Sequence, residues 1–347
     1  MRVTNNMITR NYLKSLNSNL TSMQTSMQRI NSGRRFTRIS ENLSDGARAL
    51  KVRDQLSDCN EQKALIRDAQ GWTKTADTHL SSINDLVVKV NSELAIKAKS
   101  GRSDEERQVI GKQMGELKDQ MVQILNSKYA GRNMFGSSNN NGNPFTVNAD
   151  GDLVYNGVAV KDITKNADGE YVDAAGNPVP GEEALFVDMG LGMTFVNGKI
   201  DERTAYKYSF SGLDIVGCGT QTITYKDGTT ETVPGDLFGM IQEMEKMLTG
   251  EEPYNDEKMG LMIDKTEAGR KNLMLTTTDL GNRENYLEGA ADRLEATIEN
   301  LTTIRSNLEG TDDPSEITKL NMYRYSWLAT LQMGSNILPQ SLLDYLR

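Results

Sequence analysis

Apolar residues recur at heptad spacing near both ends of this chain, and that pattern constrains the fold most. Near the start they follow one another in steps of three and four residues: Leu13, Leu16, Leu20, Met23, Met27 and Ile30. A comparable stripe near the end comprises Ile317, Leu320, Trp327, Leu331, Leu338, Leu342 and Tyr345. Such spacing is typical of helices that pack along another helix. Because each stripe alone would face water, we expect the two terminal helices to pair.

Long inner helices follow the first one and precede the last. Gly33 is a plausible stop, and Ser44 or Asp45 a plausible N-cap for a second helix over residues 47–100. The pair Ser103 and Glu106 predicts a capping box, and the helix that it opens extends to about Tyr129. The remaining helical patterns cover residues 236–248 and 255–309.

Turn residues dominate the middle of the chain, from about Gly131 to Pro234. Short β-type runs there flank dipeptides that favour tight hairpin turns: Asp150-Gly151, Asn156-Gly157, Asn197-Gly198 and Asp227-Gly228. We therefore predict an α+β fold, in which both termini form a long coiled-coil or bundle rod and a small β-rich domain is inserted between them.

The same pattern predicts three domains. Residues 1–44 with 311–347 would form a terminal coiled-coil assembly region, and residues 45–135 with 250–310 a helical bundle. Residues 136–249 would form a β-rich outer domain with one short helix near its end.

Composition and charge argue against several classes of function. The chain has a formal net charge of −9 and a pI near 5.0, which disfavours nucleic acid and anionic membrane surfaces as partners. His79 is the only histidine, and Cys59 and Cys218 lie far apart, so no zinc set can be drawn and two unpaired thiols are expected. Neither a phosphate-binding loop nor a nucleophile motif occurs. We therefore expect no catalysis, no cofactor and no metal.

The terminal stripes carry the functional hypothesis instead. One interpretation is an ordinary intramolecular core, and the other is a surface for assembly with further helices. The second is favoured because the remaining positions are rich in Asn, Ser, Thr, Gln and Met and the stripes lie at the chain ends. The predicted interface comprises Leu13, Leu16, Leu20, Met23, Met27, Ile30, Trp327, Leu331, Leu338 and Leu342.

The terminal sequences also resemble a known family. "NNMITRNYLKSLNSNLTSMQTSMQRINSGRRFTRISENLSDGARAL" (residues 5–50) is similar to the N-terminal region of bacterial flagellins, and "GSNILPQSLLDYLR" (residues 334–347) to their C-terminal end. "SKYAGRNMFGSSNNNGNPF" (residues 127–145) and "SLLDYL" (residues 341–346) resemble the branch of this family at the junction between hook and filament.

The resemblance implies a structural adapter of the flagellum that joins the hook side to the filament. Its implied partners are further copies of itself in a ring or short helical layer, another hook-associated protein on the hook side, flagellin on the filament side and a flagellar export chaperone. It further implies terminal helices that are disordered in the monomer, export by the flagellar type III apparatus without a cleaved signal peptide, and an extracellular location. The alternatives are a filament-forming flagellin and, from another class, an enzyme or adhesin carried by the β-rich region.

Overall fold

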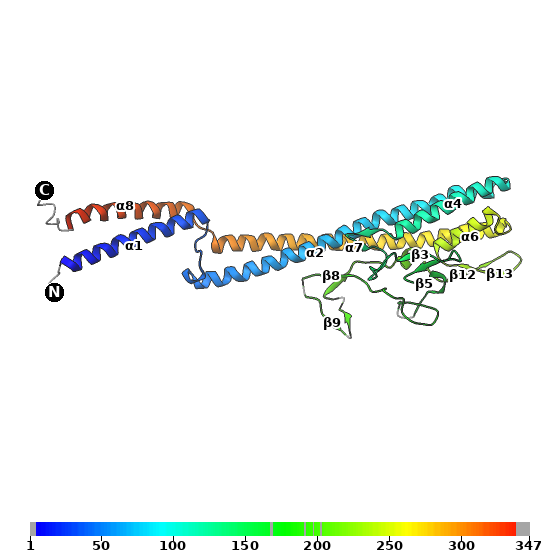
Figure 1. The fold of residues 1–347 in the computed structure, drawn as a ribbon, viewed down its shortest axis with the longest axis horizontal. Coiled ribbons are helices and arrows are strands. Elements are labelled where there is room, and N and C mark those ends of the chain that lie inside the picture. The colour runs from blue at the N-terminus through cyan, green and yellow to red at the C-terminus, as the bar shows by residue number, and fades with distance from the viewer. Residues whose placement is uncertain (1–4, 167–168, 191, 197, 202, 338–347) are drawn as a thin grey trace. The chain divides into compact units, whose positions relative to one another are not determined.

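The computed structural model describes residues 5–166, 169–190, 192–196, 198–201 and 203–337, and it confirms the α+β class (Figure 1). Helices dominate both ends of the sequence, and short strands occupy the middle. The α-helices are α1 (Asn5–Ser32), α2 (Leu43–Val88), α3 (Ile96–Lys99), α4 (Asp104–Leu125), α5 (Gly212–Val216), α6 (Leu237–Thr249), α7 (Asp256–Glu309) and α8 (Asp313–Ile337).

The strands form small antiparallel ladders rather than one continuous sheet. They are β1 (Lys128–Tyr129), β2 (Arg132–Asn133), β3 (Phe145–Val147), β4 (Leu153–Tyr155), β5 (Val158–Ala159), β6 (Thr164–Lys165), β7 (Tyr171–Val172), β8 (Phe186–Asp188), β9 (Phe195–Val196), β10 (Lys199–Ile200), β11 (Ala205–Lys207), β12 (Thr220–Thr224) and β13 (Thr230–Pro234). The pairs are β1–β2, β6–β7, β8–β11, β9–β10 and β12–β13, and β3, β4 and β5 form a three-stranded sheet.

The chain divides into two compact units, which we call unit 1 (residues 1–60 and 295–347) and unit 2 (residues 61–294). These borders differ from those predicted from the sequence at 44/45 and 310/311, and the three-domain division stays a prediction. Among the described residues, no helix is long and apolar enough to cross a membrane.

Unit 1 contains α1, α8, the beginning of α2 and the end of α7. Its helix breaks lie next to each other, because the backbone nitrogen of Arg35 donates to the carbonyl of Glu309 at 2.7 Å and that of Thr311 to Gly33 at 3.1 Å. Phe36, in the segment between α1 and α2, is buried. The predicted stop at Gly33 is therefore confirmed, α7 ends at Glu309, and the segment between α1 and α2 is held by backbone hydrogen bonds.

The N-cap of α2 differs from the prediction. Asn42, rather than Ser44 or Asp45, precedes the first turn: its Oδ1 accepts from the Asp45 backbone nitrogen at 3.2 Å, and its Nδ2 donates to the Asp45 carboxylate at 2.8 Å. The Asn42 side chain thereby satisfies one free backbone N–H at the helix start, as an N-cap does, and its amide nitrogen also holds the Asp45 carboxylate. Asp45 also forms an ion pair with Arg35, which holds the segment between α1 and α2 against the start of α2.

The second predicted helix is present over nearly its whole predicted length, and the third is shorter than expected. The run over residues 47–100 is interrupted by a π-helical turn at Lys89–Ala95, in which Asn91 is buried. The Ser103–Glu106 capping box is confirmed, but α4 ends at Leu125 instead of near Tyr129. There the Asn126 side chain exchanges two hydrogen bonds with the backbone of Phe145, of 2.8 and 2.9 Å. The chain then turns into the β1–β2 hairpin.

Unit 2 has one main hydrophobic core that helices and strands share. Trp72, Leu80 and Ile83 of α2 belong to the same buried cluster as Phe145 of β3 and Met244 of α6. Helices α4 and α6 approach closely where Gly111 faces Leu248 and Thr249, since a Cβ at Gly111 would lie 3.0 Å from each. The hairpin turns predicted at 150–151, 156–157 and 227–228 are confirmed, whereas Asn197 lies outside the described residues.

Candidate assembly interface

Helices α1 and α8 lie antiparallel, side by side, and polar groups make the described contacts between them (Figure 1). Near the middle of the pair, Asn19 Nδ2 donates to Ser326 Oγ at 3.0 Å and to Thr330 Oγ1 at 3.2 Å. Near the linker, Ser26 Oγ donates to Glu316 Oε2 at 3.0 Å. At the opposite end of the pair, the ring of Tyr12 packs over Gly334.

Glu316 is the electrostatic centre of this pair. It is 4% exposed and lies within 2.8 Å of Lys319 Nζ and 3.6 Å of an Arg29 guanidinium nitrogen. The pKa of Glu316 is lowered, chiefly by the hydrogen bond from Lys319 and further by Ser26 and Arg29. A carboxylate that accepts several charge-assisted hydrogen bonds stays ionised. The contacts of the Glu316 carboxylate with Ser26 and Arg29 therefore join α8 to α1 at this end of the pair.

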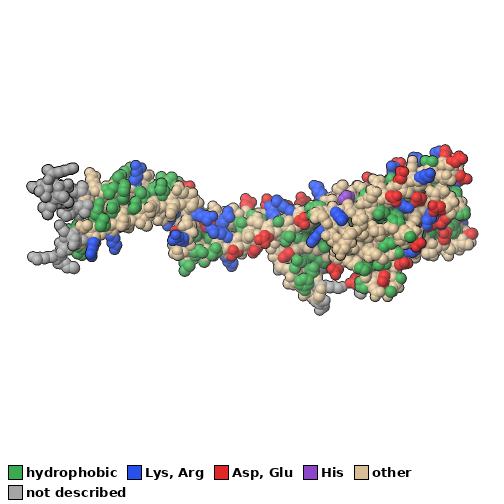
Figure 2. Space-filling model, in the orientation of Figure 1, with side chains coloured by type: hydrophobic (Ala, Val, Ile, Leu, Met, Phe, Trp, Pro, Cys, Tyr) green, Lys and Arg blue, Asp and Glu red, His purple; other side chains and the backbone are tan. Residues whose placement is uncertain are grey.

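The predicted apolar interface is divided between exposed and half-buried side chains. Leu13 is 48% exposed, Met27 is 55% exposed and Leu331 is 40% exposed. The half-buried members are Leu16, Leu20, Met23, Ile30 and Trp327. Leu338 and Leu342 lie outside the described residues. Further large apolar side chains of α8 are exposed as well: Ile317, Met322, Tyr325, Leu328 and Met333. Figure 2 shows apolar atoms along this helix pair.

Sequence reasoning missed the residues that join the two helices. Tyr12, Asn19 and Ser26 recur every seven residues, which is the heptad signal, but their polarity excluded them from an apolar stripe. Their partners on α8 are about 290 to 320 residues away in sequence, so no local pattern identifies them. Gly334 is a partial signal, because a small residue permits close approach of a ring.

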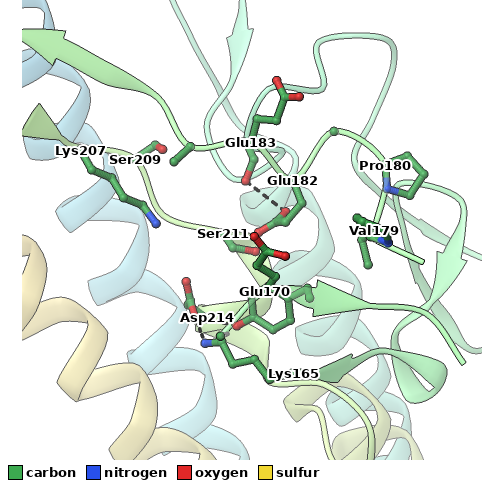
Figure 3. Close-up of a pocket in the computed structure, with 16 residues that line it drawn as sticks. Lys165, Glu170, Val179, Pro180, Glu182, Glu183, Lys207, Ser209, Ser211 and Asp214 are labelled. Carbon is green, nitrogen blue, oxygen red and sulfur yellow. Dashed lines mark hydrogen bonds and ion pairs between the residues drawn. The ribbon is translucent and has the colours of Figure 1, made fainter. Parts of the chain in front are cut away.

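A second candidate site is a cavity of about 540 Å³ in the β-rich part of unit 2, which polar and charged side chains line (Figure 3). Two of its acidic side chains are engaged by neighbours: Glu182 accepts from Tyr155 Oη at 2.6 Å, and Asp214 accepts from Tyr171 Oη at 2.6 Å and Lys165 Nζ at 3.0 Å. Burial and these carboxylates raise the pKa of both tyrosines. These contacts join the strands and loops that form the cavity wall.

None of the residues that the sequence singled out for metal or redox chemistry lines that cavity. His79 lies edge-on to the Phe135 ring at 6.4 Å, and burial lowers its pKa. Cys59 and Cys218 are both free thiols. Within the described ranges, no three His, Cys, Asp or Glu side chains are grouped as metal ligands would be.

Paired terminal helices with exposed apolar side chains, which flank a β-rich middle in the sequence, are typical of helical structural subunits. Comparison with known families gives the particular one. The family model of the bacterial flagellin N-terminal helical region matches residues 3–140, and that of the C-terminal helical region matches residues 263–346. Together they cover well over half of the sequence. The chain therefore belongs to the bacterial flagellin family, as the resemblance of its termini indicated, and is a structural component of the flagellum.

Solved structures share the fold. A protein described as a flagellar hook-associated protein of Vibrio parahaemolyticus superposes with a TM-score of 0.54 at 13% identity, covering 78% of this chain and 100% of that one. FlgL of Bacillus cereus superposes with a TM-score of 0.50 at 14% identity, covering 74% of this chain and 98% of its own. At such identity the likeness establishes the fold.

Proposed function

We propose that this chain is the adapter between hook and filament, a subunit of the hook-associated protein 3 type. In this role, α1 and α8 assemble with the same helices of neighbouring copies into a ring or short helical layer. Another hook-associated protein lies on the hook side of that layer, and flagellin on the filament side. The chain performs no catalysis and needs no cofactor.

The observation that carries this proposal is that the α1–α8 pair combines polar contacts between its helices with exposed apolar side chains. Polar side chains such as Asn19 and Ser26 join the two helices, while Leu13, Met27 and Leu331 remain exposed. Burying apolar surface stabilises by about 25 cal/mol per Å². Neighbouring subunits that cover the exposed apolar side chains would therefore stabilise the pair further.

Two sequence signatures favour the junction over the filament. The stretch over residues 127–145 resembles the junction branch, and in the structure it forms a tightly bonded unit. Asn133 Nδ2 donates to the carbonyls of Asn139 and Gly142, at 3.0 and 2.8 Å, and Asn126 bonds the backbone of Phe145. The second signature, residues 341–346, lies outside the described residues.

Delivery to the junction completes the proposal. Export through the flagellar type III apparatus, without a cleaved signal peptide, would place the chain outside the cell. An export chaperone would cover the exposed apolar residues of the terminal helices before assembly. Ordering of the chain ends on assembly costs conformational entropy, which burial between subunits must exceed.

A deletion strain tests the junction role. Without this chain, cells should still build hooks but release full-length flagellin into the medium, and the cloned gene should restore attached filaments. If the chain is instead the filament subunit, the deletion removes the main secreted flagellin rather than releasing it. Attached filaments of normal length in the deletion strain would contradict both roles.

A further inference from the structure

Charge is distributed unevenly along this acidic chain. Residues 1–60 carry ten Lys and Arg but only four Asp and Glu, whereas the whole chain has 39 against 48. Several of these cations lie in or beside the linker between α1 and α2, where Arg34, Arg35 and Arg38 occur within five residues. A cationic segment in a protein with a net charge of −9 is a specific feature and calls for a partner of opposite charge.

A cavity of about 710 Å³ lies where the end of α1 meets this linker, and we call it the arginine groove. Polar side chains line it: Thr25, Gln28, Arg29, Asn31, Ser32, Thr37, Arg38 and Glu41. Its one carboxylate, Glu41, is engaged by Thr37, which donates from both its hydroxyl and its backbone nitrogen. Most of the remaining lining groups can donate hydrogen bonds, which suits a negatively charged group.

The arginines in and beside the groove have N–H donors that are not fully used within the described part of the chain. Arg29 reaches Glu316 only at 3.6 Å, and its Nε is buried without a hydrogen-bond partner. Arg38 and the neighbouring Arg34 are exposed, and within the described part of the chain neither side chain forms a hydrogen bond or ion pair. A guanidinium presents its N–H donors in a fixed fork that matches a carboxylate. Each of these arginines can therefore bind a carboxylate of another molecule.

Unit 2 carries a matching acidic surface. A cavity of about 490 Å³ lies between the start of α4 and the loop after α6, and Asp104, Glu251 and Glu252 line it. Figure 2 shows acidic atoms over these helices, with basic atoms among them. Asp104 is paired with Arg107 at 3.3 Å, and Glu252 with Lys258 at 3.3 Å.

Two carboxylates at this acidic end have no internal partner. Glu105 and Glu251 are both exposed, and neither side chain is engaged by another described residue. Glu105 directly follows Asp104, which lines the same cavity as Glu251. Glu105 and Glu251 thus match the two free guanidinium groups beside the groove in number and are opposite to them in charge.

We propose that the arginine groove of one copy binds the acidic end of unit 2 of a neighbouring copy. The contact is heterologous, because it joins two different surfaces of the same chain, and repeated heterologous contacts produce rings or helical layers. The inference rests on the proposed function for its biological setting, and it adds a partner surface distinct from the apolar faces of α1 and α8. Charge pairs of this kind fix register and exclude wrong neighbours.

Charge reversal in purified full-length protein tests the contact. One variant carries Arg34→Glu with Arg38→Glu, and the other carries Glu105→Lys with Glu251→Lys. Static light scattering at low ionic strength gives the attraction between copies. We expect each variant alone to lose about tenfold in apparent association constant. An equimolar mixture should return to within about twofold of the wild type, because each reversed surface then meets its complement.

Matched variants separate a specific contact from a change in net charge. Lys51→Glu with Lys112→Glu, and Glu116→Lys with Asp119→Lys, alter the net charge equally at exposed positions outside both cavities. Mixing these controls should leave the attraction unchanged, and thermal melting should report folded protein throughout. The inference is overturned if either reversal leaves association intact, if the mixture fails to recover, or if the control pairs recover equally.

The scattering experiment tests the groove contact separately from the junction role. A deletion strain that keeps its filaments would refute the junction role without affecting the scattering result. A scattering result without complementarity would remove the groove contact and leave the junction role standing. Loss of attraction in the arginine variant alone would mean that the groove meets a surface of the second copy other than the acidic end, and so would also overturn the inference.

Discussion

Tyr12 of α1 lies directly over Gly334 of α8, so closely that a methyl group at Gly334 would overlap the tyrosine hydroxyl and ring. Gly334 is buried and Tyr12 is half-buried. Glycine in a helix interior costs about 1 kcal/mol relative to alanine. Its presence here is explained by the ring, which occupies the space where a side chain would be.

The first prediction concerns this pair. Gly334→Ala should destabilise the α1–α8 contact by about 1–3 kcal/mol, because the ring must move out of a packed position. In a Tyr12→Ala background the same substitution should instead stabilise by up to about 1 kcal/mol. Chemical denaturation monitored by a probe on α8 would give this double-mutant cycle. Gly281→Ala is the matched control, since nothing lies within 4 Å of its position. Equal effects of Gly334→Ala in both backgrounds would show that the ring does not matter.

The second prediction concerns the buried ammonium of Lys258. It is 7% exposed and reaches Glu231 at 2.8 Å, Glu252 at 3.3 Å and Glu243 at 3.4 Å. Lys258→Met should lower the free energy of unfolding by about 3–5 kcal/mol, because it leaves uncompensated carboxylates facing one another.

The control is Lys246→Met, which removes a half-buried partner of Glu243 at 3.5 Å and should cost less than about 1 kcal/mol. Urea unfolding of both variants at neutral pH makes the comparison. Similar losses in the free energy of unfolding would mean that the carboxylates around Lys258 contribute no more to stability than the half-buried pair of Lys246 and Glu243.

The sequence predicted features that depend on neighbouring residues. The hairpin at Asp227-Gly228 and the capping box at Ser103 depend on a few adjacent positions, and both are present. The pairing of the chain ends followed from periodicity alone. The end of α4 could not be predicted, because Asn126 bonds Phe145, 19 residues away. The α2 cap moved to Asn42 because Asp45, read as a cap, acts instead as the reciprocal partner.

The interface itself was only partly predictable. Apolar periodicity identified Leu13 and Met27, which remain exposed, and did not indicate Asn19, which joins the helices. Hydrophobic spacing indicates which face is to be buried but not which molecule covers it. The polar joints between α1 and α8 are specified by partners some 300 residues away, beyond the reach of any local rule.

The third prediction concerns Asp236, the buried N-cap of α6. Burial raises its pKa to about 6, against a smaller lowering by the hydrogen bond from the Gly239 backbone nitrogen. The folded state therefore holds a proton that the unfolded state has already lost. Stability should fall as the pH rises from about 4 to about 6, by at most roughly 1.4 kcal/mol per pH unit.

Asp236→Asn keeps a cap acceptor and removes the charge, so its stability should change less over this range and exceed that of the wild type above pH 6. Urea unfolding between pH 4 and 8 measures both slopes. Asp119→Asn, at an exposed position, controls for the loss of one charge. Parallel pH profiles for the wild type and Asp236→Asn would contradict the assignment.

The fourth prediction addresses the exposed apolar residues of the pair. Leu13→Asp with Met27→Asp should leave the thermal midpoint of the purified monomer almost unchanged, because both side chains are about half exposed. The same variant, expressed in the deletion strain, should release flagellin as the deletion does, since charged side chains would be buried between subunits. Leu275→Asp, at a site 69% exposed on α7, is the control and should restore filaments. Restored filaments with Leu13→Asp and Met27→Asp would remove these residues from the assembly interface.

The fifth prediction is that the ends of the chain are cleaved first. Among the described side chains of α1 and α8, Ser26 and Glu316 are buried, but no large apolar one is. A segment with so little buried apolar surface opens at low free energy. Brief trypsin treatment of the monomer should cut after Arg10, Lys14 and Arg324 well before the equally exposed Lys112 of α4, which packs on α6. Mass spectrometry of the fragments would give the order. Intact residues 1–40 and 312–347, after Lys112 has been cut, would refute disordered ends in the monomer.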